Sequence, residues 1–213
     1  LNYVDALFAT QFISVFSNLR KLVLRGEDSS QELDLLPLSS SLPLVTDLSF
    51  QRCSLENMES LENCSYLSTL EFHQCRVLDL KFLSKEVSPH RFTTLSIDDC
   101  RSLSTSSFAP LSRLSNLHVL EIGSEQFDNE SLQCVENMGH LKMLRLNFTK
   151  ITGTTGPFKT LTQNLFQLQE LNLMGCSGIG RQGAITGPLF STDSRLRVLS
   201  VSYCQLVDDD LKG

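Results

Sequence analysis

The chain has 213 residues, of which 41% are hydrophobic, and it carries a formal net charge of −6 at pH 7. This charge argues against wholesale binding to nucleic acid, because such binding requires basic stripes that neutralise phosphates. No apolar run reaches the roughly 18 residues that a membrane-spanning helix needs, so we expect no membrane partner.

One nine-residue phrase recurs along the chain and is clearest at Leu168–Cys176, where it reads L-x-x-L-x-L-x-x-C. Its eight copies begin at residues 19, 45, 67, 92, 117, 141, 168 and 196, in steps of 22 to 28 residues. Apolar residues fill the first, fourth and sixth positions of each copy. A period in this range is typical of leucine-rich repeats, in which each unit packs only against its neighbours.

The segment before the first strand predicts a helix, and the segment after it predicts an irregular connection. Residues 2–18 predict a helix because their apolar residues recur at helical spacing, and this helix would cap the first strand or belong to an earlier repeat. In residues 27–44, Pro37 and Pro43 exclude a long helix, and Ser39–Ser41 predict a loop.

Later connections predict short helices between the strands. Apolar residues three and four apart predict a helix in residues 54–66, 104–116 and 128–140. Residues 152–167 predict a loop followed by a short helix. Residues 177–195 contain four glycines and a proline, which favours a loop over a helix.

The ninth position of the phrase holds cysteine in five copies, at Cys53, Cys75, Cys100, Cys176 and Cys204. The other copies carry Glu27, Glu125 and Thr149 there. We expect this side chain to turn inward and to support the backbone of the turn, because a buried backbone group without a partner costs about 1–3 kcal/mol. The thiols are interpreted as reduced and structural, which predicts a reducing, cytoplasmic compartment. Sequons at Asn63, Asn129 and Asn147 carry little weight, because such tripeptides are common by chance.

Taken together, the phrase and its cysteine resemble the cysteine-containing leucine-rich repeats of F-box-type ubiquitin ligase receptors and related intracellular proteins. Two segments are similar to the usual repeat sequence of that family: Phe127-Asp-Asn-Glu-Ser-Leu132 and Cys204-Gln-Leu-Val-Asp-Asp-Asp-Leu211. The resemblance covers about residues 19–213 and implies a protein that works by binding other proteins.

The predicted fold is α/β: a right-handed β/α solenoid, or horseshoe, with a parallel sheet on the concave face and helices on the convex face. We expect one domain over residues 1–213, with eight repeats in 19–204 and the start of a ninth in 205–213. An uncapped last strand would leave its edge and core open, so we expect the native protein to continue.

Strand alternation assigns the third, fifth, seventh and eighth residues of each phrase to the concave face or its rim. The candidate partner-binding residues gather toward the C-terminal end, where apolar and aromatic side chains surround an arginine: Val119, Glu121, Met143, Arg145, Phe148, Met174 and Tyr203. Aromatic, methionine and arginine side chains are the usual anchors of interfaces. A second candidate surface is acidic and contains Asp47, Glu71, Asp98 and Asp99.

Catalytic and metal-binding chemistry is not predicted. His73, Asp98 and Cys75 stand close in the repeat, but Cys75 should point inward while His73 points outward, which excludes a nucleophile–base pair. The chain contains no C-x-x-C pair and no H-E-x-x-H motif, so we expect no metal site, no cofactor and no small-molecule substrate.

The sequence therefore predicts a non-catalytic scaffold that binds a protein partner on its concave face within a larger complex. One alternative is the substrate receptor of a ubiquitin ligase whose adaptor segment lies outside this chain. Another is a ribonucleoprotein component, for which only the basic end at Lys21, Arg25 and Arg52 qualifies. Nucleic acid is disfavoured as a partner.

Overall fold

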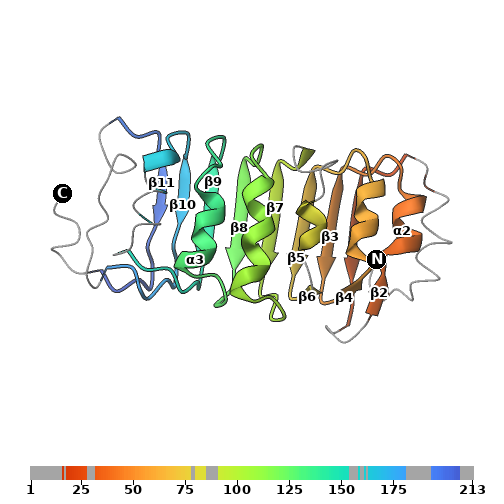
Figure 1. Ribbon diagram of the computed structural model, residues 1–213, viewed down its shortest axis with the longest axis horizontal. Helices are drawn as coiled ribbons and strands as arrows, with labels where there is room; N and C mark the ends of the chain where they lie inside the picture. The colour runs from red at the N-terminus through yellow and green to blue at the C-terminus, as the bar shows by residue number, and fades with distance from the viewer. Residues whose placement is uncertain are drawn as a thin grey trace.

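The computed structural model describes residues 16, 18–27, 32–77, 80–84, 91–153, 158, 161, 163–180 and 193–206. Within these residues, eight parallel strands form one sheet in chain order (Figure 1). The strands are β1 (Lys21–Arg25), β3 (Asp47–Gln51), β5 (Thr69–His73), β7 (Thr94–Asp98), β8 (Val119–Gly123), β9 (Met143–Asn147), β10 (Glu170–Asn172) and β11 (Val198–Ser200). Every strand begins at the third position of its phrase.

The strand register pairs like positions of neighbouring phrases. Lys21 lies opposite Asp47 at one end of the sheet, and Glu170 lies opposite Val198 at the other. In the first seven copies the fourth and sixth residues face inward and form a continuous core between the sheet and the helices, as Leu144 and Leu146 do with no exposed surface, whereas Leu199 in the last strand is 43% exposed. The predicted solenoid with its parallel sheet is confirmed.

The opposite face carries short helices, most of them 3₁₀ helices. They are α2 (Leu35–Ser41), η1 (Met58–Asn63), η2 (Lys81–Ser84), η4 (Thr105–Arg113), α3 (Asn129–Leu132) and η5 (Gln133–Val135). A 3₁₀ helix rises about 2.0 Å per residue against 1.5 Å for an α-helix, so fewer residues cross the height of a repeat. The short connections of this chain therefore favour 3₁₀ geometry, which the prediction of helices did not specify.

Nearby side chains satisfy backbone groups at two of the helix ends. Asp128 accepts hydrogen bonds from the amides of Glu130 and Ser131, both at 3.0 Å, at the start of α3. The Arg91 guanidinium donates to the carbonyls of Leu61 and Cys64, at 3.0 and 2.8 Å, at the end of η1. Such contacts serve backbone groups that lack a partner within the helix.

The predicted loop at Ser39–Ser41 is wrong, because these residues form the end of helix α2. Pro37 lies in the first turn, where its missing N–H removes no helical hydrogen bond. Asp34 caps the helix by accepting from the Leu36 amide at 2.9 Å. The serine hydroxyls donate back to carbonyls within the helix, so polar residues do not prevent it.

A second, three-stranded parallel sheet was not predicted. It consists of β2 (Glu32–Asp34), β4 (Ser54–Glu56) and β6 (Arg76–Val77), each following the turn after a main strand. Leu33 and Leu55 are paired in it and both are buried. Strands of two or three residues carry too little alternation to be recognised in the sequence.

The turn that ends each phrase has a recurring geometry. In six copies the eighth residue has a left-handed backbone, with φ between +48° and +75°: Arg52, Gln74, Asp99, Phe148, Gly175 and Tyr203. The ninth side chain then points inward. The thiols of Cys75, Cys176 and Cys204 donate to the sixth-position carbonyl of the preceding repeat, at 3.3, 2.7 and 3.0 Å.

Burial keeps these thiols protonated and able to donate. It raises the pKa of Cys100 to about 12 and that of Cys204 to about 11. Thr149 replaces cysteine without loss of the turn, because its buried hydroxyl donates to the Leu146 carbonyl at 3.2 Å. The predicted inward orientation holds for all six of these copies, with Cys204 only half-buried.

The two remaining copies depart from this geometry. Gly26 and Ser124 occupy the eighth position without a left-handed backbone, and the ninth residues Glu27 and Glu125 are exposed. In the second case Phe127 is fully buried and fills the turn instead. In every copy whose eighth residue has a left-handed backbone, the ninth side chain points inward.

Three predicted segments lie largely or wholly outside the described residues. They are the N-terminal helix over 2–18, most of the loop at 177–195, and the start of the ninth repeat at 205–213.

We predict that Cys176→Ala lowers the free energy of unfolding by about 1–3 kcal/mol, because the buried Leu146 carbonyl then keeps only the Thr149 hydroxyl as a side-chain donor and a small cavity opens. Urea denaturation under reducing conditions measures this loss. Cys204→Ala is the control and should cost less, since Cys204 is only half-buried. Equal losses, or a loss that depends on oxidant, would contradict the structural role.

Candidate functional site

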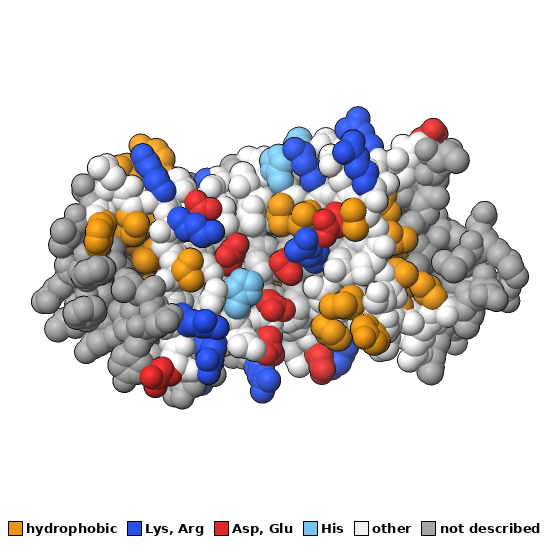
Figure 2. Space-filling model, turned by 180° about the vertical axis from the view of Figure 1, so that it is seen from behind, with side chains coloured by type: hydrophobic (Ala, Val, Ile, Leu, Met, Phe, Trp, Pro, Cys, Tyr) orange, Lys and Arg blue, Asp and Glu red, His pale blue; other side chains and the backbone are white. Residues whose placement is uncertain are grey.

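The open face of the sheet, which we call the sheet face, carries the third, fifth and seventh residues of each phrase. Figure 2 views this face from the side opposite the helices and shows acidic, basic and histidine side chains mixed across its middle. The residues at positions eight to ten form the edge where the strands end, which we call the lower rim. A hydrophobic group lies along this edge in the C-terminal half of the face (Figure 2).

Four of the predicted partner-binding residues lie together on β8 and β9. Val119 is paired with Met143, and Glu121 with Arg145. The Arg145 Nε donates to the Glu170 carboxylate at 2.7 Å, and its guanidinium lies 3.8 Å from the Glu121 carboxylate. The hydrogen bond with Glu170 and the two negative charges raise the pKa of Arg145. This arginine is held in one orientation beside two half-buried apolar side chains.

The other three predicted residues lie where strands end. Phe148 and Tyr203 occupy eighth positions on the lower rim, with 55% and 81% of their surface exposed. Between them lies Gly175, and a Cβ there would overlap the Phe148 ring. Met174 accepts a hydrogen bond from the Phe148 amide at 2.8 Å. The structure therefore places Phe148, Met174 and Tyr203 on three successive repeats.

A hollow of about 500 Å³ lies beside Phe148 on the lower rim. Asp99, Arg101, Ser124 and Glu125 are among the residues that line it. The hollow lies at the fifth copy, where the eighth residue, Ser124, lacks the left-handed backbone, so the rim is recessed there. The aromatic ring forms one wall, and charged side chains form the other.

The predicted acidic residues are spread from the start of β3 to the lower rim. Asp47 begins β3, and Asp99 lies on the lower rim, where it binds Arg101 at 3.4 Å. Glu71 and Asp98 lie near His73, whose Nδ1 is 3.9 Å from the Asp98 carboxylate. The nearby Asp98 carboxylate and the charge of Glu71 raise the pKa of His73 against the opposing effect of burial.

His73, Asp98 and Cys75 are not arranged for catalysis. The Cys75 thiol is buried and donates to the carbonyls of Phe50 and His73, at 3.3 and 3.4 Å, rather than to the His73 ring. A hydrogen bond with Cys53, together with burial, raises the pKa of Cys75. A thiol held protonated in the core is a poor nucleophile.

Within the described ranges, no group of three or more histidine, cysteine or acidic residues is placed to hold a metal ion. No helix in that part of the chain has the length and apolar character of a transmembrane span.

Arginines at the tenth position were missed. Arg76 and Arg101 follow the ladder cysteines directly and lie on the lower rim with Arg52. Strand alternation assigns residues to the concave face only up to the eighth position, so these arginines fall among the connections. Reading the tenth position as a further column would have shown Arg76, Arg101 and Lys150 in three of the eight copies.

No protein-family model matches the sequence, and no curated protein matches it. Solved structures do match. Internalin C2 from Listeria monocytogenes is 25% identical, with a TM-score of 0.67 over 88% of this chain and 73% of that chain. The leucine-rich-repeat domain of the type III effector XopL is 19% identical, with a TM-score of 0.56 over 91% and 64%. Mouse RP105, solved in complex with MD-1, is 19% identical, with a TM-score of 0.55 over 84% and 29%.

These matches and the repeat agree: the chain is a leucine-rich-repeat protein with the solenoid fold. Its resemblance to F-box-type receptors stays a prediction. The matched solenoids favour a role in protein interaction in general.

We predict that Gly175→Ala lowers the free energy of unfolding by about 1–3 kcal/mol, because its φ of +75° is strained for alanine and the new Cβ meets Phe148. In a Phe148→Ala background only the backbone cost of about 1 kcal/mol should remain. Thermal unfolding of the four proteins in this cycle measures the difference. Equal losses in both backgrounds would mean that the ring does not rest on Gly175.

Proposed function

We propose that this chain is a non-catalytic scaffold that binds a protein partner through the C-terminal half of its sheet face and the adjoining lower rim, within a larger complex. The observation that carries the proposal is the exposure of Phe148 and Tyr203 on a left-handed backbone. Bulky residues adopt this conformation at a cost of about 1–2 kcal/mol each, which glycine avoids. Strain of this kind at exposed aromatic residues favours a binding role.

The surroundings of these aromatic residues suit a protein interface. Met143 and Met174 supply adaptable apolar surface, and Arg145 supplies an oriented polar group between two carboxylates. Such a combination of aromatic anchors with methionine and arginine is typical of binding hot spots. Mouse RP105, which shares the fold, occurs in a complex with the protein MD-1.

The charge of the sheet face favours a protein over a nucleic acid. Glu71, Asp98, Glu121 and Glu170 all lie on this face. Carboxylates there would repel a phosphate backbone, whereas a protein partner can offer basic side chains. We further propose a reducing intracellular compartment, a proposal supported by seven free thiols, six of them buried. A role as a ubiquitin ligase receptor stays a prediction.

We predict that the triple substitution of Met143, Phe148 and Tyr203 by serine weakens partner binding at least about 100-fold, because aromatic anchors contribute about 2 kcal/mol or more each. The partner is first recovered by affinity capture from an extract of the source cells. Its binding to the purified wild-type chain and to the variant is then compared by calorimetry.

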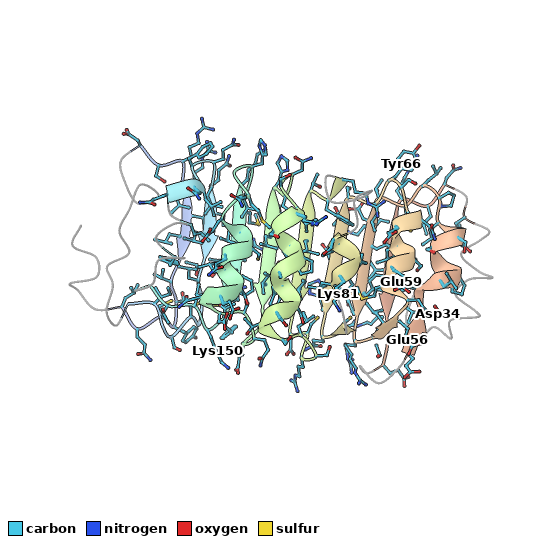
Figure 3. All side chains as sticks on the ribbon, in the orientation of Figure 1. Asp34, Glu56, Glu59, Tyr66, Lys81 and Lys150 are labelled. Carbon is cyan, nitrogen blue, oxygen red and sulfur yellow. The ribbon has the colours of Figure 1, made fainter. Side chains whose placement is uncertain are left out.

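Tyr66→Ser with Phe166→Ser is the matched control. These aromatic residues are 60% and 67% exposed, but they precede the strands and lie at the opposite edge of the sheet; Figure 3 labels Tyr66 at that edge. The control should keep full affinity, and both variants should keep the wild-type circular dichroism spectrum. Unchanged binding by the triple variant, or its loss in the control, would move the interface away from the lower rim.

A further inference from the structure

Three arginines line a hollow of about 440 Å³ on the lower rim of the N-terminal half. Arg52, Arg76 and Arg101 come from three successive repeats, and Gln74, Cys75, Asp99 and Ser102 complete the lining. Figure 2 shows basic side chains gathered along the lower edge of that half of the face. Arg52 is another long side chain held on a left-handed backbone, with φ of +56°.

The positive charge of this hollow is only partly neutralised. Across the described part of the chain, Arg52 and Arg76 are exposed and form no ion pair. Arg101 lies 3.4 Å from the Asp99 carboxylate, with 88% of its side chain exposed. Three guanidinium groups against one carboxylate leave a local charge of +2. A cluster of this kind attracts an anion that carries two charges.

A phosphate monoester fits this site better than a single carboxylate. It carries a charge of about −1.5 to −2 at neutral pH and presents three acceptor oxygens. Guanidinium forks bind such oxygens in pairs, and several arginines can share one phosphate. The Gln74 amide nitrogen donates to the Asp99 carboxylate at 3.3 Å and carries a second N–H that can donate to the ligand.

The flanks of the hollow are acidic, which limits the ligand to an isolated phosphate. Asp34 and Glu56 are paired in the second sheet on one side, and Figure 3 labels both at the lower edge. Asp98 and Glu125 lie on the other side, in the lining of the neighbouring hollow. A nucleic acid strand or an anionic membrane would bring phosphates against these carboxylates. A phosphorylated residue in a protein segment would not.

The arginine hollow continues into the hollow beside Phe148. Asp99 and Arg101 line both, and Phe148 lies at the far end of the second. Arg76 follows β5 and Phe148 follows β9, and these strands are three strand spacings apart in the sheet. The distance between the two repeats along the rim is therefore about 15 Å. An extended peptide at about 3.3 Å per residue covers this distance in four to five residues.

We propose that the lower rim binds an extended protein segment in which a phosphorylated side chain occupies the Arg52–Arg76–Arg101 hollow and an apolar side chain four or five positions away packs on Phe148. The apolar half of this inference rests on the proposed function. The phosphate half stands on the arginines alone. The proposed partner is therefore a phosphoprotein.

The probes are fluorescein-labelled 11-residue peptides with one phosphoserine and one leucine, separated by two to eight positions in both chain directions. The remaining positions are alanine, glycine and serine, and fluorescence anisotropy with the full chain measures binding. We expect the tightest binding at a separation of four or five. Serine in place of phosphoserine should weaken it at least 10-fold, as should substitution of Arg52, Arg76 and Arg101 by alanine.

The matched control replaces Lys142, Arg195 and Arg197 by alanine. It removes the same charge from exposed side chains at the opposite strand edge and should leave binding unchanged. Equal binding of phosphorylated and unphosphorylated peptides overturns the proposal. So does tight binding of inorganic phosphate alone, or tighter arginine-dependent binding of a ten-nucleotide oligouridylate than of any phosphopeptide.

A Phe148→Ser variant separates this inference from the proposed function. If phosphate-dependent binding survives in this variant without a preferred separation, the arginine site stands and the aromatic interface fails. If Phe148→Ser weakens both peptide forms while the arginine variant changes neither, the aromatic interface stands and the phosphate site is overturned.

Discussion

Hydrogen bonds between successive repeats support the solenoid in four of the eight copies, from the ninth side chain of one phrase to the sixth-position carbonyl of the phrase before it. Cys75, Cys100, Cys176 and Cys204 each donate in this way. The contact requires a small side-chain donor inside the core. It also requires the backbone to change direction at the residue before that donor. A left-handed eighth residue supplies this change of direction, so the side chain at that position points out of the fold. At the end of every such strand, an inward ninth side chain that bonds to the core therefore comes with an eighth side chain that points to solvent.

This coupling turns the lower rim into a row of exposed side chains that the core does not constrain. Arg52 and Asp99 occupy it in the N-terminal half, and Phe148 and Tyr203 in the C-terminal half. Glycine would fit the same backbone with less strain, and Gly175 does so where the Phe148 ring needs the space. The chemistry of the rim thus changes from basic to aromatic along its length, while the strands behind it keep the same register.

The sequence predicted the sheet closely, because strand position and register follow from the apolar periodicity alone. It predicted the inward ninth residue from the need of the turn backbone for a partner, correctly in six copies, whereas Glu27 and Glu125 are exposed. It also brought Val119, Glu121, Met143 and Arg145 onto two neighbouring strands. It missed helix α2, because a proline in a first turn costs little and the periodic pattern is short. It also missed the arginine hollow, because Arg76 and Arg101 follow the turn rather than the strand and their meeting depends on the stacking of three repeats.

The central claim is that a protein partner covers the left-handed rim of the C-terminal half. Amide hydrogen exchange of the chain with and without its recovered partner tests this claim most directly. We expect slower exchange in residues 145–149, 172–176 and 201–204, and no change in residues 64–67 and 163–167 at the opposite edge. Protection confined to the helical face or to the opposite edge would contradict it.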